Sequence, residues 1–121
     1  MKIKESIKNE IISILSRHLG REYLLFVFGS LAANNSNRSS DIDIAVYRSK
    51  EILPRIISEI REELNEQAHT LKDIDLVNLT EEGIASGLLE NILAKGIIWR
   101  KPKNFNDLWK NLQKRLANTK R

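Results

Sequence analysis

The chain contains no cysteine, and this absence excludes disulfide bridges and zinc sites with cysteine ligands. It has only two histidines, so neither a Ser-His-Asp triad nor a histidine-based zinc site is available. Long hydrophobic runs are missing as well, since none approaches the roughly 20 apolar residues that cross a bilayer. We therefore expect a cytoplasmic protein without a membrane segment, whose chemistry depends on other side chains.

The composition is that of a globular domain. Of the 121 residues, 41% are hydrophobic and 30% are charged, and a single domain over 1–121 is expected at this length. The net charge of +4 is unevenly placed. Residues 100–121 hold eight basic residues and one acid, whereas residues 1–99 hold twelve basic residues and fifteen acids. The excess of basic residues thus lies in the C-terminal segment. This segment is either a solvated tail or a contact site for an anionic partner.

Hydrophobic periodicity predicts alternating helices and strands. The predicted helices cover residues 3–19, 52–64, 81–95 and about 104–117. The predicted strands cover residues 23–28, 41–47, 73–79 and 97–99. Thr80 is well placed to cap the third helix, and the fourth helix is basic and amphipathic. The expected fold class is α+β, a small mixed sheet with helices packed on it.

Two motifs at the predicted strands suggest chemistry. Gly29-Ser30 follows the first strand, and Asp41-Ile42-Asp43 opens the second. Because side chains alternate along a strand, Asp41 and Asp43 should share one face, roughly 7 Å apart. A third acid, Asp75, has the same alternation in the third strand. Such a cluster should raise at least one carboxyl pKa unless a cation neutralises it, and oxygen ligands suit Mg²⁺.

Three segments carry a resemblance to a known family. They are Phe28–Ser30, Ser40–Val46 and Ile74–Leu79. In these motifs the chain resembles the minimal nucleotidyltransferases (MNT) of the DNA polymerase β-like superfamily, most closely the MntA-type antitoxins paired with HEPN-domain toxins. The resemblance extends roughly from the first strand to Trp99 and implies a polymerase β-like fold.

The resemblance also implies an activity and a set of site residues. AMP would pass from ATP to a hydroxyl, with two Mg²⁺ ions at the site. Asp41 and Asp43 match the metal-binding pair, and Asp75 matches the third carboxylate, which binds metal and helps to activate the acceptor. Asp73 shares the strand face of Asp75 and is the alternative third ligand. The nucleotide-binding residues would be Gly29, Ser30, Ser40 and Arg38.

The length of the chain bears on the acceptor. Polymerases and aminoglycoside adenylyltransferases hold their acceptors with further domains, so a chain of 121 residues is expected to modify a protein. The resemblance implies a tyrosine of a HEPN RNase toxin, which the modification would silence. The basic helix could dock this partner through Leu108, Leu112 and Leu116, or these leucines could be core. Whether the basic segment touches RNA stays open.

The chain departs from the family in its phosphate-binding turn. Leu31, Ala33 and Asn34 stand where family members commonly have Arg, Arg and Gly. The loss of charge would weaken the hold on triphosphate, although Arg38 or Arg48 could compensate. Two alternatives therefore remain: a catalytically weak antitoxin that acts by stoichiometric binding, and a small-molecule adenylyltransferase.

Overall fold

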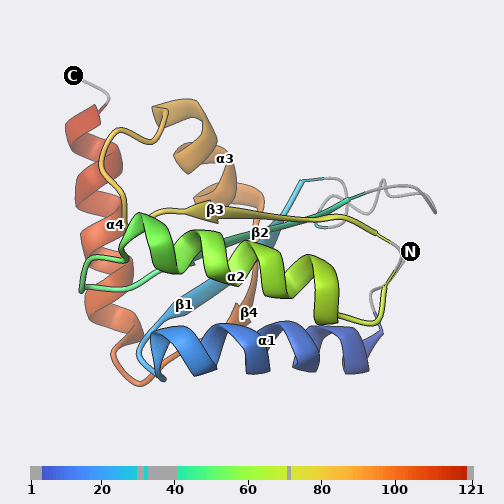
Figure 1. Ribbon diagram of the computed structural model, residues 1–121. Helices are drawn as coiled ribbons and strands as arrows, with labels where there is room; N and C mark the ends of the chain where they lie inside the picture. Colours follow the sequence, from blue (N-terminus) through green and yellow to red (C-terminus); the bar gives the residue numbers. More distant parts are fainter. Residues whose placement is uncertain (1–3, 30–31, 33–40, 71, 120–121) are drawn as a thin grey trace.

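The computed structural model describes residues 4–29, 32, 41–70 and 72–119. In these parts the chain forms helices and strands in the order α1 (Glu5–Leu19), β1 (Leu24–Phe28), β2 (Ile42–Tyr47), α2 (Pro54–Gln67), β3 (Ile74–Asn78), α3 (Ser86–Lys95), β4 (Ile97–Arg100) and α4 (Phe105–Thr119). Helices and strands of this kind make the chain an α+β protein, as predicted (Figure 1). None of the described helices is both long and apolar enough to cross a membrane.

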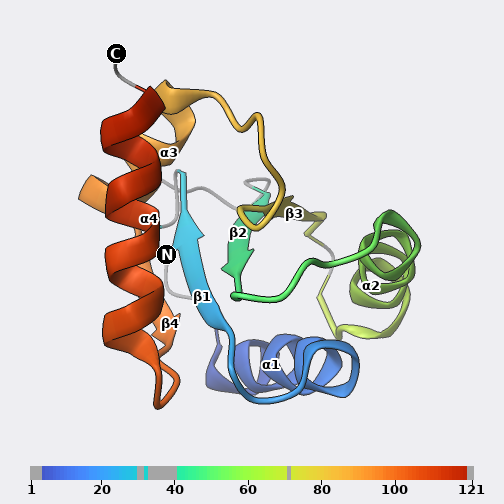
Figure 2. The same ribbon diagram turned by 90° about the vertical axis from the view of Figure 1, so that its left-hand side faces the viewer.

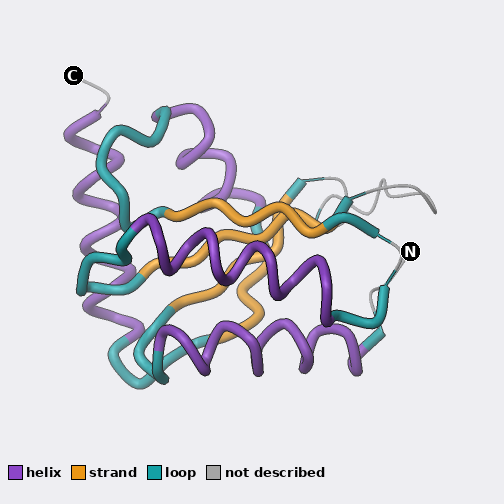
Figure 3. Tube along the Cα trace, in the orientation of Figure 1, coloured by secondary structure: helices purple, strands orange, loops and turns teal. Residues whose placement is uncertain are grey.

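The strands form one mixed sheet in the order β3-β2-β1-β4. β1 is antiparallel to both of its neighbours, β2 and β4, whereas β2 and β3 are parallel. Parallel neighbours need a crossover, and α2 supplies it between β2 and β3. The strands run through the middle of the molecule with helices on both sides (Figure 3). The mixed sheet that the sequence predicted is confirmed.

The sheet is covered on both faces, so the chain has two hydrophobic cores. α1 and α2 pack on one face, and α3 and α4 pack on the other (Figure 2). Side chains of β2 alternate between the cores: Ile42, Ile44 and Val46 lie beneath α1 and α2, whereas Ala45 and Tyr47 lie beneath α3 and α4. This alternation decides on which face the acids of β2 lie.

The third predicted helix begins later than expected. α3 starts at Ser86, and the preceding segment forms turns in which Gly83 has a φ of 90°. Thr80 caps no helix, because its hydroxyl accepts the backbone N–H of Arg48 at 3.0 Å. The N–H of Thr80 donates to Oδ1 of Asn78, also at 3.0 Å. Thr80 therefore joins the ends of β2 and β3, and its prediction as a helix cap was wrong.

The apolar side of α4 belongs to the core. Leu108 and Leu112 are buried beside α3, and Leu116 packs against the same cluster. The prediction that these leucines belong to the core is confirmed, and the alternative that they form a docking surface was wrong. Lys110 and Lys114 remain exposed on the outer side of the helix.

Candidate active site

Two of the predicted acids lie directly opposite each other on neighbouring strands. Asp43 of β2 pairs in register with Asp75 of β3. Side chains opposite each other on paired strands share a face, and here it is the face covered by α3 and α4. Asp43 is half-buried and Asp75 is exposed. Asp41 is exposed and immediately precedes β2. The sheet therefore gathers the acids at one end of two parallel strands.

Gly29 lies against Asp43. It follows β1 directly, and Phe28, the last residue of β1, pairs in register with Asp43. Gly29 has a φ of 75°, which favours glycine. A Cβ at this position would also overlap the carboxylate of Asp43. Gly29 thus serves two needs, a left-handed turn and space for an acid, and the second of these was not expected from the sequence.

The electrostatics of the cluster follow from this placement. Burial raises the pKa of Asp43 above its ordinary value, and the negative charges of Asp75 and Asp41 raise it further. Across the described residues, no ion pair joins any of these three carboxylates to a lysine or arginine. The expectation that clustering would raise a carboxyl pKa is confirmed, and the site attracts cations.

The structure does not describe all of the predicted site residues. Ser30, Arg38 and Ser40 lie outside the described residues, as do Leu31, Ala33 and Asn34 of the variant turn. Where the chain is described, no group of three or more acidic or histidine side chains is arranged to hold one metal ion. Donor chemistry at Asp43 and Asp75 fits a hard cation, but the convergence of all three acids on shared ions stays a prediction.

Asp73, the alternative third acid, occupies a different position. It precedes β3 and is exposed, and its backbone oxygen accepts the N–H of Ile42 at 2.8 Å. Asp75 contributes to the raised pKa of Asp43, whereas Asp73 is not among the charges that do so. The electrostatic partner of Asp43 on β3 is therefore Asp75.

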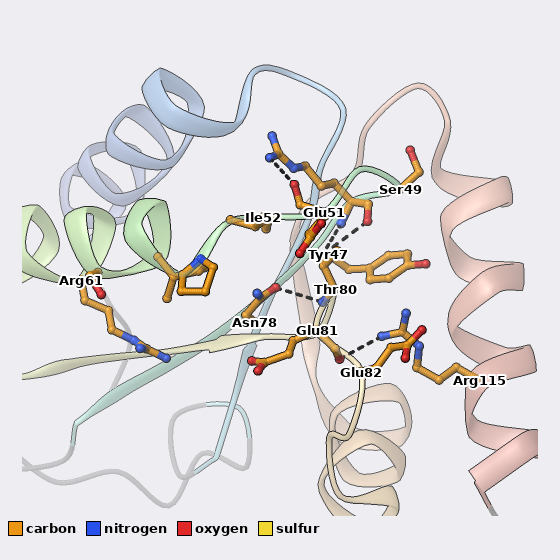
Figure 4. Close-up of a pocket in the computed structure, with 14 residues that line it drawn as sticks. Tyr47, Ser49, Glu51, Ile52, Arg61, Asn78, Thr80, Glu81, Glu82 and Arg115 are labelled. Carbon is orange, nitrogen blue, oxygen red and sulfur yellow. Dashed lines mark hydrogen bonds between the residues drawn. The ribbon is translucent and has the colours of Figure 1, made fainter.

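A cavity of about 820 Å³ lies at the other end of β2 and β3, away from the acids. Its lining includes Arg48, Arg61 and Arg115 but none of the three clustered aspartates (Figure 4). Each of these guanidinium groups binds backbone carbonyls: Arg48 those of Leu19, Lys50 and Glu51, Arg61 that of Leu76, and Arg115 those of Leu79 and Glu81. The interpretation of Arg48 as a compensating phosphate ligand was therefore wrong. Its guanidinium group binds backbone carbonyls at the end of β2 that lies away from the aspartates.

Comparison with solved structures identifies the fold. A crystal structure of a toxin–antitoxin with AMP-PNP is 23% identical, covering 93% of this chain and 82% of that one, with a TM-score of 0.68. A structure of tri-AMPylated Shewanella oneidensis HEPN toxin with MNT antitoxin is 21% identical, covering 98% and 87%, with a TM-score of 0.71. An MntA–HepT toxin–antitoxin structure is 21% identical, covering 97% and 87%, with a TM-score of 0.70.

Sequence comparison places the chain in a family. A search of curated proteins finds no match. The family model for "Polymerase beta, Nucleotidyltransferase" matches residues 9–103, which run from α1 past β4 and include Gly29 and the acids of β2 and β3. Because this match covers most of the chain, the chain belongs to the polymerase beta nucleotidyltransferase family.

Proposed function

We propose that the chain is an antitoxin that transfers AMP from ATP to a hydroxyl, with a tyrosine of a HEPN-domain toxin as acceptor. The proposal draws on the family, on the AMP-PNP in one structural neighbour and on the AMPylated toxin in another. The observation that carries it is the in-register pairing of Asp43 with Asp75 beside the Gly29 turn. Such a site combines a turn suited to phosphate with carboxylates suited to a divalent cation.

The two strand acids would have different tasks in this reaction. Asp75 is exposed, so an acceptor hydroxyl from a partner protein can reach its carboxylate. As general base, Asp75 would take the hydroxyl proton while the oxygen attacks the α-phosphorus of ATP. The new P–O bond to the acceptor forms as the bond between the α-phosphorus and its bridging oxygen breaks, and pyrophosphate leaves. Asp43, half-buried and fixed between Gly29 and β3, would hold its position throughout.

Mg²⁺ would bind at Asp41, Asp43 and Asp75, where it would stabilise the charge of the attacking and leaving oxygens. The nucleotide phosphates would lie at Gly29 and Ser30, with Ser40 and Arg38 as further ligands. Gly29 lets backbone N–H groups approach the phosphates because it has no side chain in the way.

The test is label transfer from ATP to a purified HEPN-domain toxin, the proposed partner of this chain. We expect label from α-³²P-ATP on the toxin and none from γ-³²P-ATP, because AMP retains only the α-phosphate. Asp43→Asn and Asp75→Asn should abolish transfer, whereas Asp73→Asn should retain it. Transfer that is equal in the wild type and Asp43→Asn would refute the proposal.

A second function is favoured by Leu31 and Ala33, which stand where members of the family that this chain resembles commonly have arginine, so two positive charges are missing from the phosphate-binding turn. In that case the chain would neutralise its toxin by contact alone. A growth assay separates the two: Asp43→Asn chain that still protects cells from the toxin supports contact, and loss of protection supports transfer.

A further inference from the structure

The cavity at the far end of β2 and β3 has no part in the proposed reaction. Its volume of about 820 Å³ lies in the range of small-molecule sites. The ends of β2 and β3, the start of α2 and one residue of α4 surround it (Figure 4). Most of the described side chains that line it are polar or charged, whereas Ile52, Pro54 and Ile57 are purely apolar. Ligand sites are usually mostly apolar, so a lining of this kind suits a polar ligand.

One buried donor in the wall of this cavity lacks an acceptor. Asn78, the last residue of β3, lines the cavity and is only 8% exposed. Its Oδ1 accepts the backbone N–H of Thr80 at 3.0 Å (Figure 4). Because that N–H can only donate, Oδ1 must face Thr80, and Nδ2 must point away from it. Nδ2 bonds to no described residue and is not sealed inside the protein, so it opens on the cavity. Its acceptor must come from outside the chain.

Positive charge surrounds this donor. Arg61 bonds to Leu76 through Nη2 alone, which leaves its Nε and Nη1 to donate elsewhere. Burial lowers the pKa of Arg48, and no carboxylate offsets this effect. Neither these two arginines nor Arg115 forms an ion pair within the described parts of the chain. α2 begins at Pro54 without a side-chain cap or an acid in its first turn, so the positive end of its dipole is not offset. An oxyanion would satisfy these groups.

The lining also restricts what else the ligand can carry. Glu51, Glu81 and Glu82 line the cavity and are exposed, whereas Asn78 is buried, so the acids lie nearer to solvent. None of the three forms an ion pair with a described residue. They would repel a polyanion such as a nucleoside triphosphate, and the arginines would repel a simple cation. A molecule that carries both an oxyanion and an amine is complementary to both sets of charges.

We propose that this cavity binds a small zwitterion, whose oxyanion accepts hydrogen bonds from Asn78 and Arg61 and whose amine faces the glutamates. Amino acids, with a carboxylate, and phosphorylated amines, with a phosphate, share this chemistry. Hydrogen bonds from a guanidinium to an oxyanion are strengthened by charge, so Arg61 supplies much of the affinity. The inference goes beyond the proposed function and does not depend on AMP transfer, because the clustered aspartates do not line the cavity.

The test is an NMR titration of the ¹⁵N-labelled chain. The probes are a mixture of the common L-amino acids and, separately, phosphoethanolamine; acetate and inorganic phosphate are the matched probes without an amine. The side-chain amide signals of Asn78 are assigned by their absence from the spectrum of Asn78→Asp. We expect these signals to move to saturation with one of the two zwitterion probes, and the probe that moves them identifies the oxyanion as carboxylate or phosphate.

Variants of the lining test the role of each group, with the backbone amide of Thr80 as the reporter. Asn78→Asp keeps the acceptor for Thr80 but replaces the donor with an oxygen, so it should abolish binding. Arg61→Gln should weaken binding about tenfold or more, whereas Arg55→Gln, an exposed arginine of the same helix outside the lining, should change nothing. Glu81→Gln/Glu82→Gln should weaken binding of the zwitterion, and these exposed positions decide the question if Asn78→Asp fails to fold.

Three outcomes would overturn the inference. Signals of Asn78 that stay in place with every probe would show that the cavity binds none of them. Equal affinity for acetate or inorganic phosphate and for the zwitterion would exclude a role for the amine. Equal affinity of Arg61→Gln and Arg55→Gln would exclude the cavity as the binding site. Each of these results would leave the proposed function intact, because label transfer to the toxin is measured independently.

Discussion

The pairing of Asp43 with Asp75 predicts that removing one charge stabilises the chain. Like charges directly opposite each other on paired strands destabilise a sheet, and cross-strand side-chain pairs are typically worth about 0.2–1 kcal/mol. For a domain of this size that energy corresponds to roughly 1–4 °C in melting temperature. We expect Asp43→Asn and Asp75→Asn each to raise the melting temperature at neutral pH by an amount in this range.

The pH dependence of this gain has a definite sign. The pKa of Asp43 is raised in the folded state, so the folded chain binds more protons than the unfolded chain between the ordinary and raised values. The destabilisation is therefore absent below the ordinary pKa and complete above the raised one. The advantage of Asp43→Asn over the wild type should appear as the pH rises through this window, and about 1 M salt should reduce it.

Thermal unfolding followed by circular dichroism measures all of these effects. Both single substitutions relieve the same repulsion, so Asp43→Asn/Asp75→Asn should gain less than the sum of the two. Asp73→Asn is the control, because Asp73 is exposed and does not raise the pKa of Asp43. The reasoning is refuted if Asp73→Asn stabilises as much as Asp43→Asn, or if the gain persists at about pH 3, where carboxylates are largely protonated.

Three further substitutions test other parts of the structure. Gly29→Ala should lose AMP transfer, whereas Gly83→Ala, which has a similar left-handed φ but open space around it, should lose only about 1–2 kcal/mol of stability; equal activity of the two would contradict the packing described. Tyr23→Phe should cost about 0.5–1.5 kcal/mol in urea unfolding, because the buried hydroxyl bonds to a serine at 2.8 Å and a backbone oxygen at 3.2 Å. Hydrogen bonds from His69 lower the pKa of Glu10, so their stabilisation is present above the ordinary pKa and lost as pH falls through the lowered value. The melting temperatures of wild type and Glu10→Gln should therefore converge in acid, and a constant difference would exclude this cause.

Sequence reasoning succeeded where the signal is local. The apolar run of β1 and the Asp-Ile-Asp alternation of β2 fix both the strands and the faces of their side chains, because strand geometry has a period of two. The helical spacing of α2 is equally local. Each of these could be read without knowing what lies beside it.

Contacts between distant segments could not be read in this way. Threonine is a residue type that often caps helices, but the end of β2 lies beside Thr80, and its hydroxyl accepts the backbone N–H of Arg48 instead. Arg48 has the charge of a phosphate ligand, but neighbouring carbonyls take its donors. The register that sets Asp43 against Asp75 depends on the pairing of two strands, and no single segment contains it.

Two arginine contacts to β3 and to the residue after it have a consequence for the acids of the sheet. Arg61 links α2 to Leu76, the residue of β3 that follows Asp75, and Arg115 links α4 to Leu79, which follows β3. Both contacts hold β3 in place and so oppose a separation of β2 and β3 that would relieve the repulsion between Asp43 and Asp75. The negative potential is thus preorganised, and the cation proposed for this site would bind with little rearrangement of the backbone.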